Sequence, residues 1–465
     1  MNNKYKKLFK NVGLLTIGNF ASKLLTFLLI PVYTNILSTS EYGVADLIFT
    51  TVSLLYPVFS VLMSEAIMRF ALDNKDNNQV FSCAFYITTC GTVIFLCLSP
   101  IFLLFNSLKA YYIFFILYYI FDVFNLIFLQ FVKGINKVKN YVIAGIISTV
   151  VTISLNIILL VIVKIGLVGY LISYIGGQVS SIVFLVISCK IWKYLLPYKK
   201  TDKKVLKNMM NFSIPMIPNS ISWWISNSSD KYMLSYFTTL SITGIYSVSY
   251  KIPSIITIFS NIFMGAWQIS AVDNFGSEES KQFYSKIFKN YFSFLAIIIS
   301  VLIIVLKIIA RFLFVKDFYV AWECSGILLI ATMFNGLAAF LGSIYTSAKK
   351  TKFLFHSTLI AAISNIIMNL ILIPFIGAIG AAIATLISYF LVWLLRLINS
   401  KKILNINYDY KIIIFSTLIL LTQVFLQIYS VYHYFVINCI LFIVLLLINK
   451  DIFISILKKM RIIRA

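Results

Sequence analysis

Long apolar stretches alternate with short, lysine-rich segments along the whole 465-residue chain. Most of the stretches hold roughly 20 residues, and a helix of that length crosses the ~30 Å hydrocarbon core of a bilayer. The pattern therefore predicts fourteen transmembrane helices. They lie at residues 12–37, 42–66, 80–105, 110–132, 141–163, 167–189, 209–238, 242–270, 290–314, 322–346, 353–374, 377–399, 411–428 and 431–449.

The composition fits a membrane protein and excludes two other classes. The chain is 61% hydrophobic and 12% charged, whereas soluble domains average about 45–50% apolar and about 25% charged residues. This little charge cannot cover a soluble enzyme of this size, and this much Phe, Ile and Leu excludes a disordered chain. Transmembrane β-barrels consist of short strands with alternating hydrophobicity. We therefore expect an all-α polytopic membrane protein.

The charges follow the same alternation. The net charge is +24, but the cations lie in short clusters between apolar stretches rather than on one face, so they do not indicate nucleic-acid binding. If the N-terminus is inside, the inner segments carry 31 of the 39 Lys and Arg residues and the outer segments carry five. This bias predicts cytoplasmic termini and places residues 190–208 inside.

Two six-helix units repeat along the chain. Asn156 precedes a Gly-x-x-Gly motif at 166–169, and Asn369 precedes another at 377–380. Because an even number of spans repeats in one orientation, this predicts two pseudo-symmetric lobes, as in transporters with a central site. The predicted parts are an N-terminal lobe at 1–190, a cytoplasmic linker at 191–208, a C-terminal lobe at 209–400, and two further helices with a basic tail at 401–465.

No pattern for catalysis or for a metal stands out. There is no GxxxxGK[ST] loop, no CxxC pair, and only two histidines, so we expect neither an enzyme nor a metal or other cofactor. A membrane glycosyltransferase, the rival enzyme class, needs larger loops than these. Three of the six cysteines, Cys83, Cys90 and Cys97, recur every seven residues, which predicts packing on one helical stripe.

Three cations lie inside predicted spans, where a charge costs at least ~2.5 kcal/mol and needs a reason. Lys23 shares a helical face with Asn19, and Lys251 has no acidic neighbour at helical spacing. We expect both lysines to face a common cavity. Lys231 follows Asp230 directly, so it either pairs with Asp230 or extends toward the interface.

The seventh span is too polar to face lipid, and we expect it to line a water-filled cavity. Its candidate substrate-binding residues are Asn219, Trp223, Asn227, Asp230 and Lys231. Trp223 packs in the helix bundle, belongs to the interfacial belt of aromatic residues, or stacks on sugar faces. Asp122, which has no local cation, is either a protonated structural residue or a site for a coupling ion or proton, and Asp230 is a second candidate for coupling.

Four stretches of the sequence carry a family resemblance: residues 19–43, residues 230–251 and the two Asn…Gly-x-x-Gly units. With the fourteen spans, they resemble the multidrug/oligosaccharidyl-lipid/polysaccharide (MOP) flippase superfamily, and within it the Wzx-type flippases of O-antigen and capsule synthesis. The resemblance implies a two-lobe fold that works by alternating access. It also implies transfer of an undecaprenyl-pyrophosphate-linked oligosaccharide to the outer leaflet of a bacterial cytoplasmic membrane.

Other implications of the resemblance remain open. The partners it implies are membrane lipids, a polysaccharide polymerase, glycosyltransferases and a coupling ion, either H⁺ or Na⁺. A cation-coupled multidrug exporter and a lipid II flippase are the alternatives. The lysines in the predicted spans favour an anionic substrate, because a pyrophosphate needs fixed cations.

Overall fold

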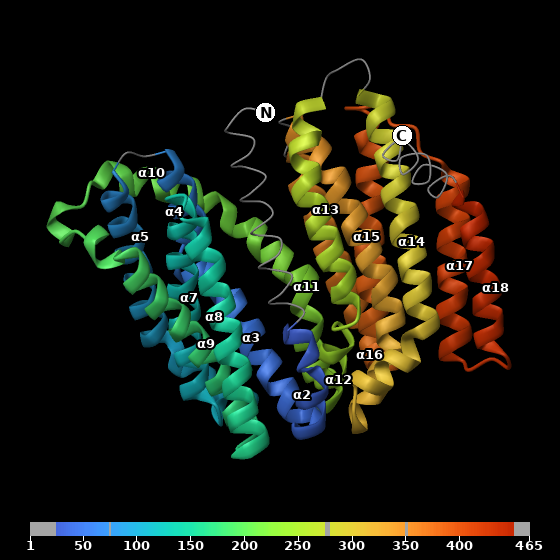
Figure 1. Ribbon diagram of the computed structural model, residues 1–465, viewed down its shortest axis with the longest axis horizontal. Coiled ribbons are helices and arrows are strands. Elements are labelled where there is room, and N and C mark those ends of the chain that lie inside the picture. Colours follow the sequence, from blue (N-terminus) through green and yellow to red (C-terminus); the bar gives the residue numbers. More distant parts are fainter. Residues whose placement is uncertain (1–24, 74–75, 275–279, 349–351, 451–465) are drawn as a thin grey trace, which may run out of the picture. The chain divides into compact units, whose positions relative to one another are not determined.

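The computed structural model describes residues 25–73, 76–274, 280–348 and 352–450, and every regular element in these ranges is a helix (Figure 1). The predicted all-α class is therefore confirmed. The main helices are α2 (Ile30–Ile36), α3 (Thr39–Phe59), α4 (Met63–Asp73), α5 (Asn77–Leu98), α7 (Tyr112–Gly134), α8 (Val138–Asn156), α9 (Gly166–Cys189), α10 (Lys203–Ser213), α11 (Ile217–Phe237), α12 (Leu240–Ser249), α13 (Pro253–Asn274), α14 (Ser280–Leu313), α15 (Trp322–Ser347), α16 (Lys352–Ser400), α17 (Tyr410–Ile428) and α18 (Tyr434–Ile448).

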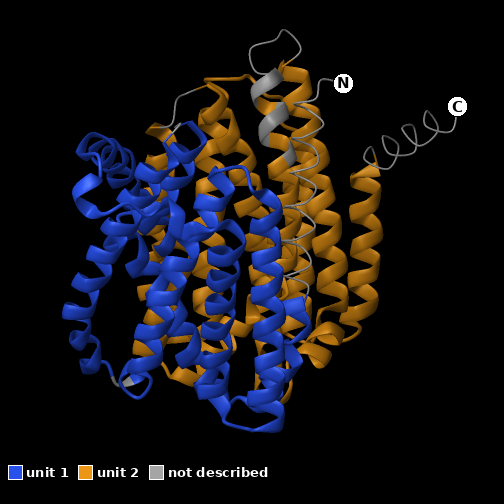
Figure 2. Cartoon of the chain, turned by 60° about the vertical axis from the view of Figure 1, so that its left-hand side comes forward, with its two compact units in different colours: residues 1–224 blue, residues 225–465 orange. Residues whose placement is uncertain are grey.

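The chain forms two compact units, residues 1–224 and 225–465, coloured separately in Figure 2. The boundary falls inside α11, between Trp224 and Ile225. The predicted limits of the lobes, linker and C-terminal pair stay predictions, although the predicted linker includes short 3-10 turns and the start of α10.

Nine described helices are long and apolar enough to cross a membrane, or ten if the bent pair α12–α13 forms one span. The chain is therefore a multi-pass membrane protein. Each of the fourteen predicted stretches overlaps a described helix. However, α11 is more polar and α18 is shorter than the helices counted as membrane-spanning. Fourteen crossings thus stay a prediction.

The two repeated glycine motifs adopt the same local structure. Gly166 and Gly377 have φ angles of 55° and 54°, the left-handed region that glycine enters without strain, and each follows the end of one apolar helix. Three residues later, Gly169 and Gly380 pack so closely against the preceding helix that a Cβ would approach Leu159 to 3.0 Å and Leu372 to 2.7 Å. The repeat seen in the sequence is therefore a structural repeat.

The second helix of each repeat also begins in the same way. Ser38 caps α3 by accepting a hydrogen bond from the backbone N of Glu41, and Thr239 caps α12 by accepting one from Ile242. Such caps satisfy backbone N–H groups that the first turn leaves unpaired. The caps give fixed reference points for comparing the two units residue by residue.

Within unit 1, α4, α5, α7 and α9 pack around a buried apolar core. Cys83 and Cys189 belong to this core, but Cys90 and Cys97 are exposed, so the predicted packing of Cys83, Cys90 and Cys97 on one stripe is wrong. The seven-residue spacing drifts around a straight helix by about 20° per repeat, and the later cysteines of α5 lie where few helices cover it.

Within unit 2, α15 is the central helix, and 89% of the residues in its most apolar stretch are buried. The C-terminal pair α17–α18 lies beside α14 (Figure 1). Gln423 of α17 accepts a hydrogen bond from the Ser300 hydroxyl of α14 (2.8 Å) and donates one to the Asn438 carbonyl of α18 (3.0 Å). A buried amide thus joins the pair to the rest of the unit.

Candidate functional site

The side chain of Asp230 on α11 is the centre of a buried polar cluster in unit 2. Only 1% of Asp230 is exposed. Its Oδ2 accepts hydrogen bonds from the hydroxyls of Tyr246 (2.6 Å), Tyr250 (3.2 Å) and Thr385 (3.3 Å). Charge-assisted hydrogen bonds of this kind are what allows a carboxylate to remain in a buried site.

Three segments bring these groups together. Tyr246 on α12 and Tyr250 directly after it are one helical turn apart, so both hydroxyls reach the same oxygen, and Thr385 comes from the second half of α16. The Lys231 backbone N–H donates to the other carboxylate oxygen, Oδ1, at 2.9 Å. Both oxygens of Asp230 are therefore held in place.

A chain of amides continues the Asp230 cluster along α11 and α16. Asn227 accepts a hydrogen bond from the Tyr389 hydroxyl. Ser229 donates to Asn365 Oδ1 (3.3 Å), which also accepts from Asn369 (2.9 Å). The fully buried Asn369 Oδ1 accepts no hydrogen bond from the described residues. Side-chain oxygens such as that of Asn369 are the kind of ligand that hard cations prefer.

The other predicted residues of unit 2 lie close to this cluster. The Lys231 ammonium lies 5.9 Å from the centre of the Tyr250 ring, and the side chain is half-buried. Lys251 is half-buried in the break between α12 and α13, where the axis bends by 44°. The single span predicted at 242–270 is therefore interrupted beside Lys251, because Pro253 begins a new helix.

The predicted residues of unit 1 are more scattered. Asn219 is exposed near the start of α11, and Trp223 is half-buried one turn later. Asn19 and Lys23 lie outside the described residues. Asp122 on α7 accepts a hydrogen bond from Gln178 Nε2 at 3.0 Å, and Asn125 donates to the Oε1 of the same glutamine. The α7–α9 contact therefore holds the Gln178 amide in one orientation.

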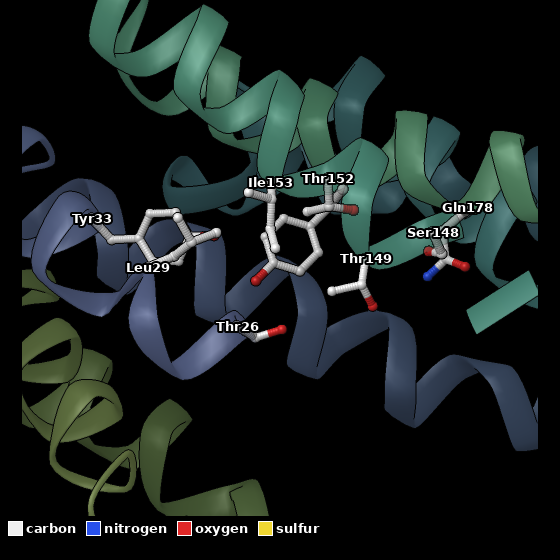
Figure 3. A pocket seen from close by; sticks show the side chains of 9 residues that line it. Thr26, Leu29, Tyr33, Ser148, Thr149, Thr152, Ile153 and Gln178 are labelled. Atoms are coloured by element: carbon white, nitrogen blue, oxygen red, sulfur yellow. The ribbon is translucent and has the colours of Figure 1, made fainter. Parts of the chain in front are cut away.

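Gln178 also lines a polar pocket of about 150 Å³ in unit 1 (Figure 3). Seven of its nine lining residues carry hydroxyl or amide groups, which is unusual among apolar spans. The lining residues are Thr26, Leu29, Tyr33, Ser148, Thr149, Thr152, Ile153, Tyr174 and Gln178. The Tyr33 hydroxyl is fixed by Asn156, which donates to it at 3.1 Å. We call this cavity the hydroxyl pocket.

The hydroxyl pocket and the Asp230 cluster occupy matching places of the repeat. Leu29 lies nine residues before the capping residue of unit 1, and Asp230 lies nine residues before that of unit 2. Thr26 and Asn227 likewise correspond, each three residues earlier. Eight and twelve residues after the left-handed glycine stand Tyr174 and Gln178 in unit 1, and Thr385 and Tyr389 in unit 2.

Sequence reasoning missed both the pocket and most partners of Asp230. The repeat itself held the signal, because carrying Asp230 and its neighbours across the two capping residues and the two glycines points to the pocket residues. Among the described residues, no group of three His, Cys, Asp or Glu side chains could hold a metal ion. Any cation at Asp230 would therefore meet one carboxylate and neutral oxygens.

Comparisons with known proteins agree with this architecture. The chain is 17% identical to the lipid II flippase MurJ in an inward closed conformation, with a TM-score of 0.70 over 95% of this chain and 98% of that one. It is 13% identical to a multidrug resistance MATE family transporter of the MOP superfamily in an inward-facing conformation, with a TM-score of 0.66 over 82% and 94%. These likenesses confirm the predicted MOP fold.

Two curated relatives are similar over part of their length. A probable low-salt glycan biosynthesis flippase of Haloferax volcanii is 22% identical over 46% of both chains. An uncharacterized membrane protein of Methanocaldococcus jannaschii is 27% identical over 49% of this chain and 48% of the relative. The chain thus matches about half the length of each. The model of the polysaccharide biosynthesis protein family matches residues 8–268, and the chain belongs to that family.

Proposed function

We propose that this protein is a flippase that moves an undecaprenyl-pyrophosphate-linked oligosaccharide from the inner to the outer leaflet of a bacterial cytoplasmic membrane. The family, the MOP fold and the relative described as a glycan biosynthesis flippase support transport of a lipid-linked glycan. The observation that carries the glycan part is the hydroxyl pocket, a polar cavity inside a lobe made of apolar helices.

The lining of the pocket has the chemistry to contact a sugar. Here the walls present Ser and Thr hydroxyls, two tyrosine rings and an oriented amide. Such groups exchange hydrogen bonds with sugar hydroxyls, while the rings cover the apolar faces of the sugar.

The remaining parts of the substrate require other surfaces. Lys23 and Lys251 are our candidates for binding the pyrophosphate. Further candidates for contact with the substrate during transport are Asn19, Asn219, Trp223 and Lys231. A compact ammonium group binds phosphate as a point charge. The polyprenyl tail needs no polar site because it can remain in the lipid during alternating access.

Asp230 is our candidate for coupling transport to a cation, either H⁺ or Na⁺. Its carboxylate already accepts three hydroxyl donors, so a cation would compete with those donors and change the packing between α11, α12 and α16. This would give the binding of a small ion a differential effect on two states. In this proposal Asp122 orients Gln178 toward the pocket and is not a coupling residue.

The proposed topology has both termini in the cytoplasm, which places the 191–208 linker on that face with the glycosyltransferases. A polysaccharide polymerase would receive the product outside. Labelling a single cysteine at position 200 tests the topology. We expect an impermeant thiol reagent to react only after the membrane is opened, and reaction in intact cells would contradict the topology.

Deletion of the gene tests the proposed function. We expect loss of surface polysaccharide and accumulation of lipid-linked repeat units on the inner leaflet, both restored by the wild-type chain. Lowered resistance to cationic dyes with normal surface glycan would instead identify a drug exporter. Death of the cells with accumulated lipid II would identify a lipid II flippase.

A further inference from the structure

The segment that runs from the end of α9 into the first half of α10 is a strongly basic, ordered surface of unit 1, which we call the linker platform (residues 190–208). It contains one acidic residue, Asp202, and seven lysines whose side chains are all exposed. These lysines are Lys190, Lys193, Lys199, Lys200, Lys203, Lys204 and Lys207.

Three side chains along one stripe of α5 hold the platform in place. Gln79 donates from Nε2 to the Lys200 carbonyl (2.9 Å) and accepts at Oε1 from the Asp202 N–H (2.8 Å). Ser82 and Tyr86, each about one turn further, bind the two polar groups of the Leu196 backbone, its N–H and its carbonyl, both at 2.8 Å. The main chain of the linker is therefore fixed before any partner binds.

Buried side chains add to this attachment. Ile191, near the start of the platform, and Met209, directly after its last residue, belong to the core of unit 1. The Tyr194 ring packs edge-on against Phe131 of α7, with 5.0 Å between centroids. The linker consequently rests on the ends of α5, α7 and α9, and Figure 1 shows it beside the first turns of α5.

The depth of the platform points to the lipid headgroups. Tyr86 lies nine residues into α5, about 13 Å along the helix axis from Asn77, and its ring contacts Tyr198. The platform thus borders the beginning of an apolar, membrane-length helix. Trp192 and Tyr198 are 54% and 67% exposed, and such aromatic residues are enriched at the membrane–water interface.

We propose that the linker platform binds the headgroups of anionic phospholipids at the membrane surface. Clustered lysines beside a membrane attract anionic lipid, and each contributes separately. The fixed backbone lowers the entropy that ordering the lysines would otherwise cost. The exposed aromatic rings and the position beside α5 favour a lipid surface over an acidic protein. This proposal does not depend on the identity of the transported substrate.

The test uses the purified full-length chain in detergent, titrated with short-chain phosphatidylglycerol or phosphatidylcholine, with bound lipids counted by native mass spectrometry. The platform variant replaces Lys193, Lys199, Lys200, Lys203 and Lys204 by Gln. The control variant removes the same charge elsewhere, by replacing Lys281, Lys286, Lys401, Lys402 and Lys411 by Gln. Thermal unfolding without added lipid checks that both variants fold.

We expect the platform variant to lose at least about tenfold in affinity for phosphatidylglycerol, and the control variant to stay within about twofold of the wild type. If the five-residue variant does not fold, the triple variant Lys193→Gln, Lys199→Gln, Lys200→Gln, which leaves α10 intact, should still lose several-fold. Unchanged affinity in the folded platform variant, equal loss in the control, or equal binding of the two lipids by the wild type would overturn the proposal.

Discussion

The hydroxyl pocket of unit 1 and the Asp230 cluster of unit 2 occupy corresponding positions of the repeat. The first is a polar cavity, whereas the second is a hydrogen-bonded carboxylate. In unit 2 a buried carboxylate accepts hydrogen bonds from three hydroxyls. In unit 1 the corresponding position is Leu29, which draws no hydroxyl, and a cavity of about 150 Å³ lies beside it. In the same register Tyr246 and Tyr250 correspond to Ala45 and Phe49, so unit 1 lacks the carboxylate and two of its hydroxyl partners. The comparison teaches that the same framework holds a hydrogen-bonded carboxylate in one unit and a polar pocket in the other.

The physical reason is the cost of unsatisfied polar groups in a lipid environment. A hydroxyl buried inside a membrane protein needs a partner. Asp230 supplies that partner internally. The hydroxyls of the pocket border a space of about 150 Å³ that can hold water or a ligand, so the pocket can exchange its contents. We therefore propose that the sugar contacts the pocket of unit 1 and that ion coupling involves Asp230 of unit 2.

The largest effect should come from making unit 2 resemble unit 1 through Asp230→Leu. This change removes the acceptor of three buried hydroxyls, and each unsatisfied donor costs about 1–3 kcal/mol. We expect low membrane abundance and no transport. Asp230→Asn keeps an acceptor oxygen and should restore abundance while transport stays at least tenfold lower, measured as surface glycan in a deletion strain. A well-expressed Asp230→Asn variant with full surface glycan would show that the residue only holds the helices together.

A large but selective effect should come from filling the pocket by Thr149→Phe. The new ring would occupy space that the proposed sugar needs, so transport should fall by more than about tenfold, whereas Thr149→Val removes one neutral hydrogen bond, worth roughly 1 kcal/mol, and should cost only several-fold. The matched control is Val150→Phe, because Val150 is 48% exposed on the same helix and does not line the pocket. Normal transport by Thr149→Phe, or equal loss in Val150→Phe, would remove the pocket from the mechanism.

A smaller effect, on stability, should come from the two glycines that anchor the repeat. Alanine in the left-handed region costs about 1–2 kcal/mol. At Gly166 the added Cβ would lie 3.2 Å from Glu41 Oε1, and at Gly377 it meets open space but the backbone angles (φ 54°, ψ -130°) belong to a region that alanine hardly adopts, so both variants should be destabilised. Thermal unfolding in detergent measures both. Gly145→Ala, inside α8 with open space around it, should instead be neutral or stabilising; a loss there as large as at Gly166 would contradict the role of backbone conformation.

Most of the helical framework could be predicted from the sequence, because the membrane forces apolar stretches of defined length to be helices. The glycine repeat was also visible, since Gly166 and Gly377 are required by backbone geometry. The break between α12 and α13 was missed because both halves are apolar and hydropathy does not detect a bend. Pro253 was its only local signal.

The candidate site was predicted less completely. The polarity of α11 singled out Asp230 and Asn227, but their partners Tyr246, Thr385 and Tyr389 are distant in sequence, and tyrosine in a membrane protein is usually interfacial. The linker appeared as a charged loop because its attachment depends on backbone groups meeting Gln79, Ser82 and Tyr86. Such contacts leave no pattern in a single sequence.

Reconstitution of the purified protein tests the central claim most directly. Vesicles would contain an undecaprenyl-pyrophosphate-linked oligosaccharide on the inner leaflet, and an added impermeant glycosidase would report its arrival outside. We predict rapid exposure of the glycan in vesicles with the wild-type chain, and slow exposure with Thr149→Phe or with no protein. The experiment would be repeated with H⁺ and Na⁺ gradients across the membrane. If the correctly folded wild-type chain exposes the glycan as slowly as protein-free vesicles do under all these conditions, the proposed flippase function is contradicted.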